Sequence, residues 1–180
     1  MASKLKTVLG PLRAMYRERP LEAVAVTGAR TVVESRPENP LRCVVAPIAH
    51  PGVVLPVDLH PAVGGTGDAP CPGDYLSAAV VACVTSSIRA CADVMGIELA
   101  AVDVEMVNRA DVRSLLGLPA PERIEGVGMK LRWQVEVGKA TPSQQAEQLM
   151  EVALRGSPVL QLVMRAADVQ IDGNLVVPPV

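Results

Sequence analysis

Residues 70–98, "PCPGDYLSAAVVACVTSSIRACADVMGIE", are the stretch that decides the fold of this chain. Apolar residues recur through it at helical spacing, prolines stand at its start, and Gly96 follows its end as a C-cap, which predicts a helix over about residues 73–95. At about 100° per residue, Cys83 lies on a face of small and apolar side chains, so we expect it to face the interior or a partner subunit. The members of this face are Leu76, Ala79, Ser86, Ser87, Ala90 and Val94, and the opposite side carries Asp74, Tyr75, Thr85, Arg89 and Asp93.

The cysteines around this helix have two interpretations. A free cysteine packs as a small hydrophobic side chain, and it can also be a nucleophile. The helix dipole does not activate Cys83, because this residue lies roughly 15 Å from the helix start and the dipole effect fades within one turn. A reactive thiolate there needs an arginine from another segment. Cys71 lies just before the helix start, where a thiolate is favoured, or it is a loop cysteine without a role.

The rest of the chain groups its strands between helices. A second helix is predicted to start with Thr141 as N-cap and Pro142 at the first position, and to run to about residue 154 before a break and more helix. This order indicates an α+β fold with antiparallel sheet rather than alternating βαβ units. Strands are predicted over residues 22–35, 41–48, 53–59, 99–108 and 123–137, with a last strand, an Asp-Gly turn and a tail over residues 168–180. We expect a single domain over residues 21–180 and an N-terminal arm over residues 1–20, whose helix breaks at Gly10-Pro11.

The composition argues against several kinds of protein. Of 180 residues, 49% are hydrophobic and 20% are charged, which is typical of a folded globular chain. The net charge is −2, with one Trp, two Tyr and no Phe, so we expect no nucleic-acid partner. The N-terminus has no signal-peptide pattern, and the uncharged run Tyr75–Ile88 is shorter than the roughly 20 residues that cross a bilayer. We therefore expect a cytoplasmic protein with no membrane partner.

The cysteines and histidines predict no metal site. Cys43, Cys71, Cys83 and Cys91 have no CxxC spacing, and a zinc site built from only two His would need ligands from distant segments. Reduced thiols are the expected state. The "GGTG" at residues 64–67 follows no clean strand-to-helix junction, and it is either a weak phosphate-loop signal or a plain flexible loop.

Three quoted segments carry a resemblance to a known family. "PGDYLSAAVVACVTSSIRACADVMGIEL" resembles the central helix of the OsmC/Ohr family of thiol-dependent hydroperoxide reductases. "LHPAVGGTGDAPCPGD" is similar to the glycine-rich lead-in of one OsmC-like subgroup, and "AEQLMEVALRGSPVLQLVMRAADVQI" is similar to the family's second helix and last strand. The resemblance extends over about residues 22–172. It implies antiparallel sheets packed on two long helices in an intertwined homodimer, with two sites at the subunit interface.

The same resemblance implies a function. Cys83 would be the peroxidatic cysteine, whose thiolate attacks the O–O bond of an organic hydroperoxide and becomes a sulfenic acid. A second thiol then condenses with the sulfenic acid to form a disulfide, and an external dithiol restores the reduced enzyme. No metal or organic cofactor is implied, and the biological role would be defence against oxidative stress.

Three positions depart from the family's pattern. The resolving cysteine that precedes Pro-Val in the family is Ser157 here, and a hydroxyl forms no disulfide. The family's glutamate before the central helix falls at Gly73, so Asp74 either substitutes for it or is a first-turn acid favoured by the helix dipole. The segment "TGAR" nominates Arg30 as the activating arginine, and the alternative is a solvated strand residue.

Three hypotheses follow. The chain is a hydroperoxide reductase that uses Cys83 with Arg30 and Asp74, resolved by an external thiol or by Cys71. Alternatively, it is a dimer that has lost catalysis and binds a small apolar ligand at its interface. The third hypothesis is a dimeric scaffold with neither property. The first predicts fast, selective oxidation of Cys83, and the others predict a slow, buried thiol.

Overall fold

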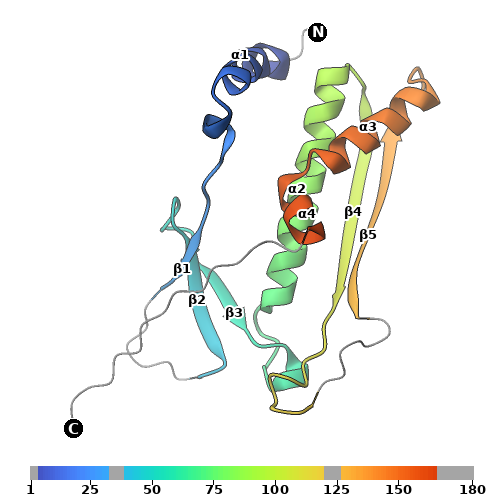
Figure 1. Cartoon of the computed structure of the whole chain (residues 1–180). Coiled ribbons are helices and arrows are strands. Elements are labelled where there is room, and N and C mark those ends of the chain that lie inside the picture. Colours follow the sequence, from blue (N-terminus) through green and yellow to red (C-terminus); the bar gives the residue numbers. More distant parts are fainter. Residues whose placement is uncertain (1–3, 33–38, 120–126, 166–180) are drawn as a thin grey trace.

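The protein has an α+β fold in which helices and antiparallel sheets follow one another as the sequence predicts (Figure 1). The structure is a computed structural model that describes residues 4–32, 39–119 and 127–165. The predicted strand and Asp-Gly turn over residues 168–180 lie outside the described residues. A long central helix, α2, separates a three-stranded sheet from a two-stranded sheet.

The first sheet has the order β1-β2-β3, with strands Ala29–Thr31, Arg42–Pro47 and Leu55–Asp58. Both pairings are antiparallel, with Arg30 opposite Ala46 and Cys43 opposite Val57. The strands predicted over residues 41–48 and 53–59 are present, although the second is shorter. A strand pair or one bent strand around Gly28 is predicted over residues 22–35, and of its described part only β1 is a strand, after a 3-10 helix, Pro20–Ala23. Residues 33–35 lie outside the described residues.

The second sheet is an antiparallel pair of long strands, β4 (Leu99–Arg109) and β5 (Gly128–Val137). Val104 lies opposite Trp133 in the middle of this ladder. The alternation of apolar and polar residues predicts both strands, because one face of the pair packs on α2 and the other does not.

Helix α2 runs from Pro72 to Met95 and ends at Gly96, whose φ of 72° is the left-handed conformation that the predicted C-cap requires. Helix α3 (Ser143–Arg155) starts one residue later than predicted, with Pro142 rather than Thr141 at the N-cap, and α4 (Pro158–Met164) follows the predicted break. By length and composition alone α2 could cross a membrane, contrary to expectation, but a single such helix is weak support because the core helix of a water-soluble protein meets the same test.

The core forms where α2 meets α3, α4 and the β4–β5 pair. Val80, Val84 and Ile88 are fully buried at successive helical turns of α2 and pack with Met150, Ala153 and Leu160. Burying each such side chain contributes roughly 1.5–3 kcal/mol.

This buried stripe corrects the helix face expected from the sequence. Leu76, Ala79 and Ser86 are exposed in the single chain, and Cys83 is half-buried at the border of the stripe. The helix is apolar around most of its circumference, so periodicity alone does not separate the face that meets its own sheet from the face left open. The Cys83 face is expected to meet either the interior of the chain or a partner subunit. The interior is wrong for its exposed members, Leu76, Ala79 and Ser86, and contact with a partner subunit stays a prediction.

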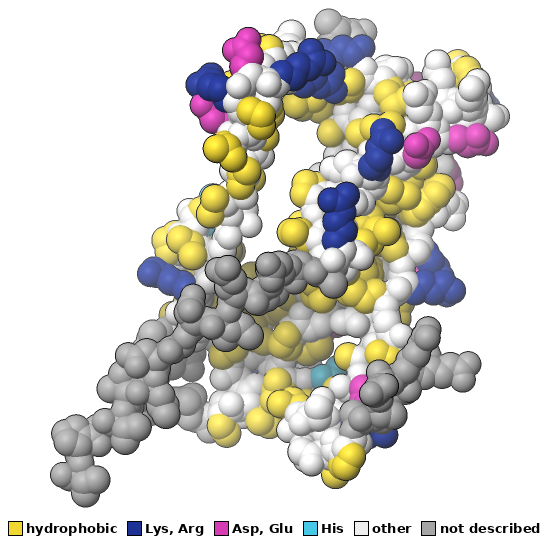
Figure 2. All heavy atoms as spheres, in the orientation of Figure 1, with side chains coloured by type: hydrophobic (Ala, Val, Ile, Leu, Met, Phe, Trp, Pro, Cys, Tyr) yellow, Lys and Arg dark blue, Asp and Glu magenta, His cyan; other side chains and the backbone are white. Residues whose placement is uncertain are grey.

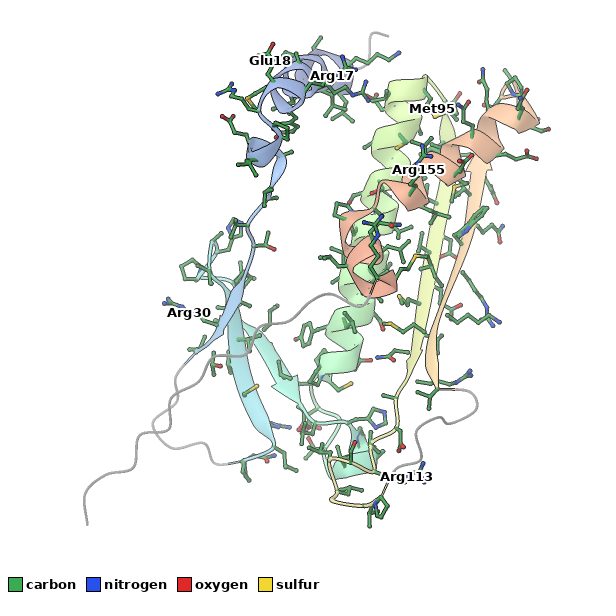
Figure 3. The ribbon with its side chains drawn as sticks, viewed as in Figure 1. Arg17, Glu18, Arg30, Met95, Arg113 and Arg155 are labelled. Atoms are coloured by element: carbon green, nitrogen blue, oxygen red, sulfur yellow. The ribbon has the colours of Figure 1, made fainter. Side chains whose placement is uncertain are left out.

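Helix α1 (Lys4–Glu18) lies near the end of α2 that carries Met95 (Figure 3). The break predicted at Gly10-Pro11 is absent, because the helix continues through Pro11. An extended segment joins this helix to the three-stranded sheet (Figure 1).

Candidate functional site

The side chain of Cys83 meets the side chain of Ser157 between α2 and α4. The Ser157 hydroxyl donates a hydrogen bond to Cys83 Sγ with an Oγ–Sγ distance of 3.2 Å. Ser157 is fully buried and Cys83 is half-buried, so this contact lies at the edge of the buried region. Two residues nominated from the sequence, 74 positions apart, therefore form one site.

The turn between α3 and α4 sets the position of Ser157. The N–H of Gly156 donates to Val152 O at 2.9 Å, and a side chain at Gly156 would crowd the same carbonyl oxygen. Pro158 then opens α4 at a position where its missing N–H is not needed. Leu160 anchors α4 in the same core as Val80 and Val84, so the serine is held rigidly against α2.

Asp74 caps the start of α2 rather than approaching Cys83. Its carboxylate accepts a hydrogen bond from the backbone N–H of Cys71 at 2.8 Å. This bond and the Cys71 thiol lower the pKa of Asp74, burial opposes them, and His60 lowers it least. Nine residues of helix, roughly 14 Å, separate Asp74 from Cys83 along the axis. These contacts are those of an acid in the first turn of a helix, as one of the two interpretations of Asp74 predicts. Within one chain, the Asp74 carboxylate does not approach the Cys83 thiol.

The other cysteines near α2 are too distant from Cys83 to form a disulfide with it in an intact helix. Cys71 is the N-cap residue, about 18 Å from Cys83 along the axis, and Cys91 is about 12 Å away in the other direction. A disulfide needs Cα atoms within about 7 Å. Resolution of Cys83 by Cys71 of the same chain would therefore require several turns of α2 to unwind.

Arg30 is not assembled with Cys83 in the single chain. It is exposed in β1, and its side chain points away from α2 (Figure 3). An arginine reaching the sulfur from this strand would have to come from a second copy of the chain.

The glycine-rich loop contains a buried carboxylate that sequence reasoning missed. Asp58 is fully buried at the end of β3, and it accepts hydrogen bonds from the Thr66 hydroxyl at 2.7 Å and from the N–H groups of Thr66, Gly67 and Leu59. The Thr66 hydroxyl contributes most to lowering the pKa of Asp58, the backbone bonds add to it, and burial opposes it. The acid in a β-strand followed by "GGTG" was the available signal.

Arg42 and Gly65 complete the organisation of this loop. The Arg42 guanidinium donates to Thr66 Oγ1 and pairs with Asp68, and Gly65 passes so close to Leu59 O that no side chain fits there. Side chains of β2 and β3 therefore hold residues 66–68 in place, and no phosphate is needed to account for these contacts. The loop leads directly to Cys71 and positions the start of α2.

A cavity of about 530 Å³ lies between this loop, the start of α2 and the end of β4. Its polar lining residues are His60, Cys71, Asp74, Ser77 and Asn108, and Leu59, Val63, Met106 and Leu115 are among its apolar ones. Nδ1 of His60 accepts the N–H of Ala62 at 3.1 Å, so this ring stabilises the loop. Among the described residues, no group of three or more His, Cys, Asp and Glu is arranged to hold a metal ion.

The sequence model of the OsmC-like protein family matches residues 65–172, which include α2, Cys83 and Ser157. The chain belongs to the OsmC-like protein family. The resemblance inferred from the central helix is thereby confirmed. OsmC-like proteins are typically soluble, and in this chain one side of α2 packs in the core. No curated protein matches the sequence.

Solved structures of OsmC-like proteins share the fold. An organic hydroperoxide resistance protein OsmC from Legionella pneumophila matches with a TM-score of 0.53 and 22% identity, over 81% of this chain and 94% of that one. An OsmC-like protein from Vibrio cholerae matches with 0.60 and 14%, over 78% and 94%. One from Mycoplasma pneumoniae matches with 0.58 and 11%, over 78% and 88%. These likenesses establish the α+β architecture expected from the sequence.

Proposed function

We propose that this protein reduces organic hydroperoxides with Cys83 as the peroxidatic thiol. The observation that carries the proposal is the half-buried Cys83 sulfur, bonded to a buried hydroxyl, on the helix at the centre of the family match. A thiol reacts selectively when it is accessible on one side and its anion is supported on the other. One structural relative is named an organic hydroperoxide resistance protein, which agrees with this chemistry.

The reaction needs only thiols and the peroxide. The Cys83 thiolate attacks the terminal oxygen of ROOH, an S–O bond forms, the O–O bond breaks, and the alkoxide leaves to take up a proton as ROH. The first thiol of an external dithiol then attacks the sulfenic sulfur and expels water, which leaves a mixed disulfide. The second thiol of the reductant closes its own disulfide and releases Cys83 reduced.

The proposal includes a homodimer in the cytoplasm. A second copy of the chain would cover the exposed face of α2 and would bring its own Arg30 toward Cys83, since Arg30 does not reach it within one chain. A guanidinium near the sulfur would favour the thiolate. Asp74 keeps its helix-capping role, with no direct part in the chemistry. The N-terminal arm, residues 1–20, would lie outside the catalytic domain.

The test is peroxide oxidation with mass spectrometry. Reduced protein is mixed with a small excess of cumene hydroperoxide and dimedone, and peptides are mapped. We expect a rapid dimedone adduct on Cys83 and none on Cys91. Cys83→Ser should abolish cumene hydroperoxide reduction while the melting temperature changes little, because the two side chains are similar in size. Cys91→Ser is the matched control on the same helix and should retain activity. An unmodified Cys83 in folded protein would reject the proposal.

A second function, binding of a small apolar ligand without catalysis, is favoured by a different observation. A cavity of about 750 Å³ between α4 and the β4–β5 pair is lined mainly by apolar side chains, including Met106, Met129, Trp133 and Met164. Cavities of this size and lining are typical of ligand sites. A saturable change in the fluorescence of Trp133 on addition of a fatty acid would report binding in this cavity. If Cys83 is also not oxidised by peroxide, this result would support binding over catalysis.

A further inference from the structure

Ser157 uses its hydroxyl in an unusual way for its position. It is the N-cap residue of α4, where a serine side chain ordinarily accepts an N–H from the first turn of the helix. The Ser157 side chain makes no such bond. A buried hydroxyl needs a partner, and within the described residues Ser157 Oγ bonds to the sulfur of Cys83 instead. The Ser157 side chain therefore does not stabilise the start of α4 and bonds to the Cys83 sulfur instead.

When Cys83 is ionised, its sulfur has no proton to donate, so the Ser157 hydroxyl must be the donor of this hydrogen bond. A hydroxyl that donates to a charged acceptor forms a stronger bond than one that donates to a neutral acceptor. Sulfur in a neutral thiol is only a weak acceptor, whereas a thiolate carries the charge that the O–H dipole meets. Ser157 is held by the α3–α4 turn and by Leu160 in the core, so the donor is already oriented before any peroxide arrives.

We propose that Ser157 is a catalytic residue whose hydroxyl supports Cys83 as a thiolate and then as a sulfenic acid. This inference rests on the proposed function. A cysteine at position 157 would condense with the sulfenic acid to form a disulfide. A hydroxyl at this position can only donate a hydrogen bond to the oxidised group, which stabilises it. The cycle therefore uses one cysteine of the chain, and the thiol that attacks the sulfenic acid belongs to the external reductant.

The chemistry balances with three participants. Cys83–S⁻ and ROOH give Cys83–SOH and RO⁻, and the alkoxide gains a proton from solvent. The Ser157 O–H keeps its own proton throughout and only moves its hydrogen bond from the sulfur to the new oxygen. Cys83–SOH and a dithiol give water, the reduced thiol and the cyclic disulfide of the reductant. With Cys71 and Cys91 about 18 Å and 12 Å away along α2, the sulfenic acid has no partner on its own helix and waits for this reductant.

The first measurement compares Ser157→Ala with wild type. The second-order rate constant for oxidation of Cys83 by cumene hydroperoxide is followed by quenching with dimedone and intact mass. Loss of a hydrogen bond to a charged group should slow this step about tenfold. Ser143→Ala is the control, because Ser143 is an exposed serine at the start of α3, away from Cys83 and from the exposed face of α2, and its rate should equal that of wild type. Circular dichroism and the melting temperature check that each variant is folded.

The second measurement uses Ser157→Cys, which replaces the donor by a thiol at the same place. With an Oγ–Sγ distance of 3.2 Å in the native pair, the introduced sulfur should reach Cys83 after oxidation. One equivalent of peroxide should then give a disulfide between the two positions, with no dimedone adduct. Wild type should instead keep its dimedone-reactive sulfenic acid until dithiothreitol is added.

The outcomes separate this inference from the proposed function. If Cys83 is not oxidised in folded wild type, the proposed function fails and the inference fails with it. If Cys83 is oxidised but Ser157→Ala reacts as fast as wild type, only the role of Ser157 is overturned. A disulfide between Cys83 and another cysteine in peroxide-treated wild type, whether in one chain or between two, would overturn the one-cysteine cycle and leave the peroxidatic assignment standing.

Discussion

At the scale of single residues, Cys83 and Cys91 are two half-buried thiols of one helix that lie in different surroundings. Cys83 meets a buried hydroxyl. Cys91 packs among apolar side chains of both core clusters. Because the surroundings of the two sulfur atoms differ, we expect the two thiols to differ in reactivity.

The reactivity of Cys91 is a prediction at this scale. Burial raises the pKa of the Cys91 thiol, and the positive charge of Arg13 on α1 opposes this only in part. A raised pKa means less thiolate at neutral pH, so we expect Cys91 to be alkylated by iodoacetamide slowly at pH 7. Its rate should rise only above the pH range where an ordinary cysteine ionises. Peptide mapping after timed alkylation between pH 7 and pH 10 measures this. Equal rates for Cys91 in folded and urea-unfolded protein at pH 8 would contradict it.

At the scale of elements, the start of α2 is organised by acids on two sides. Asp74 lies inside the helix and binds the backbone of Cys71, while Asp58 lies in β3 and holds the loop that delivers the chain to Cys71. Both carboxylates therefore act on the geometry of the helix start and of the neighbouring 530 Å³ cavity.

For Asp74, we expect a loss of stability without a loss of chemistry. Asp74→Ala removes the acceptor for the Cys71 N–H and should lower the free energy of unfolding by about 1 kcal/mol. Oxidation of Cys83 by cumene hydroperoxide should stay within about twofold of wild type, since some 14 Å of helix separates the two residues. Urea unfolding and peroxide kinetics measure the two quantities. Asp74→Asn, which keeps an oxygen acceptor, is the control, and a tenfold slower reaction in both variants would restore a catalytic role.

For Asp58, we expect a stability contribution that disappears in acid. Its pKa is lowered in the folded protein, so the ionised form contributes stability above the unfolded value of 3.8, and this contribution is lost as the pH falls through the lower folded pKa. Asp58→Asn should lower the melting temperature by several degrees at pH 7. The gap between variant and wild type should narrow as the pH is reduced below 3.8. Calorimetry across this range measures the gap, and a constant gap would show that the carboxylate charge is unimportant.

At the scale of the whole molecule, many large apolar side chains of the described residues are exposed in the single chain. Leu21, Val24 and Val26 are more than half exposed, as are Val53 and Val54. Figure 2 shows hydrophobic side chains gathered along the segment between α1 and the three-stranded sheet. Exposed apolar surface of this extent marks an interaction surface.

The predicted assembly is a homodimer that covers the exposed face of α2. Light scattering coupled to size exclusion should give about twice the mass of 18.9 kDa. Leu76 is 41% exposed on this face, and Leu76→Asp should shift the mass toward the monomer and slow peroxide reduction, because the site would lose the partner's Arg30. Leu76→Met keeps the surface apolar and should leave the dimer intact. A monomeric wild type at micromolar concentration would reject both the assembly and an arginine supplied across it.

The sequence by itself determined the elements and the family. Helical spacing and Gly96 define α2, alternation defines β4 and β5, and the quoted segments around Cys83 and Ser157 carry the family resemblance. These features are local, because a cap, a turn or a periodic pattern depends on residues near one another in the chain.

Only the tertiary structure decided which of these residues meet. It placed the Ser157 hydroxyl on Cys83, assigned Asp74 to the helix start and buried Asp58 beneath the glycine-rich loop. It also showed that the buried side of α2 is the stripe of Val80, Val84 and Ile88, while Leu76 lies open. Because α2 is apolar around most of its circumference, its sequence does not show which face packs on its own sheet. The contact between Cys83 and Ser157 joins residues 74 positions apart and depends on how α4 packs on α2, which no local pattern encodes.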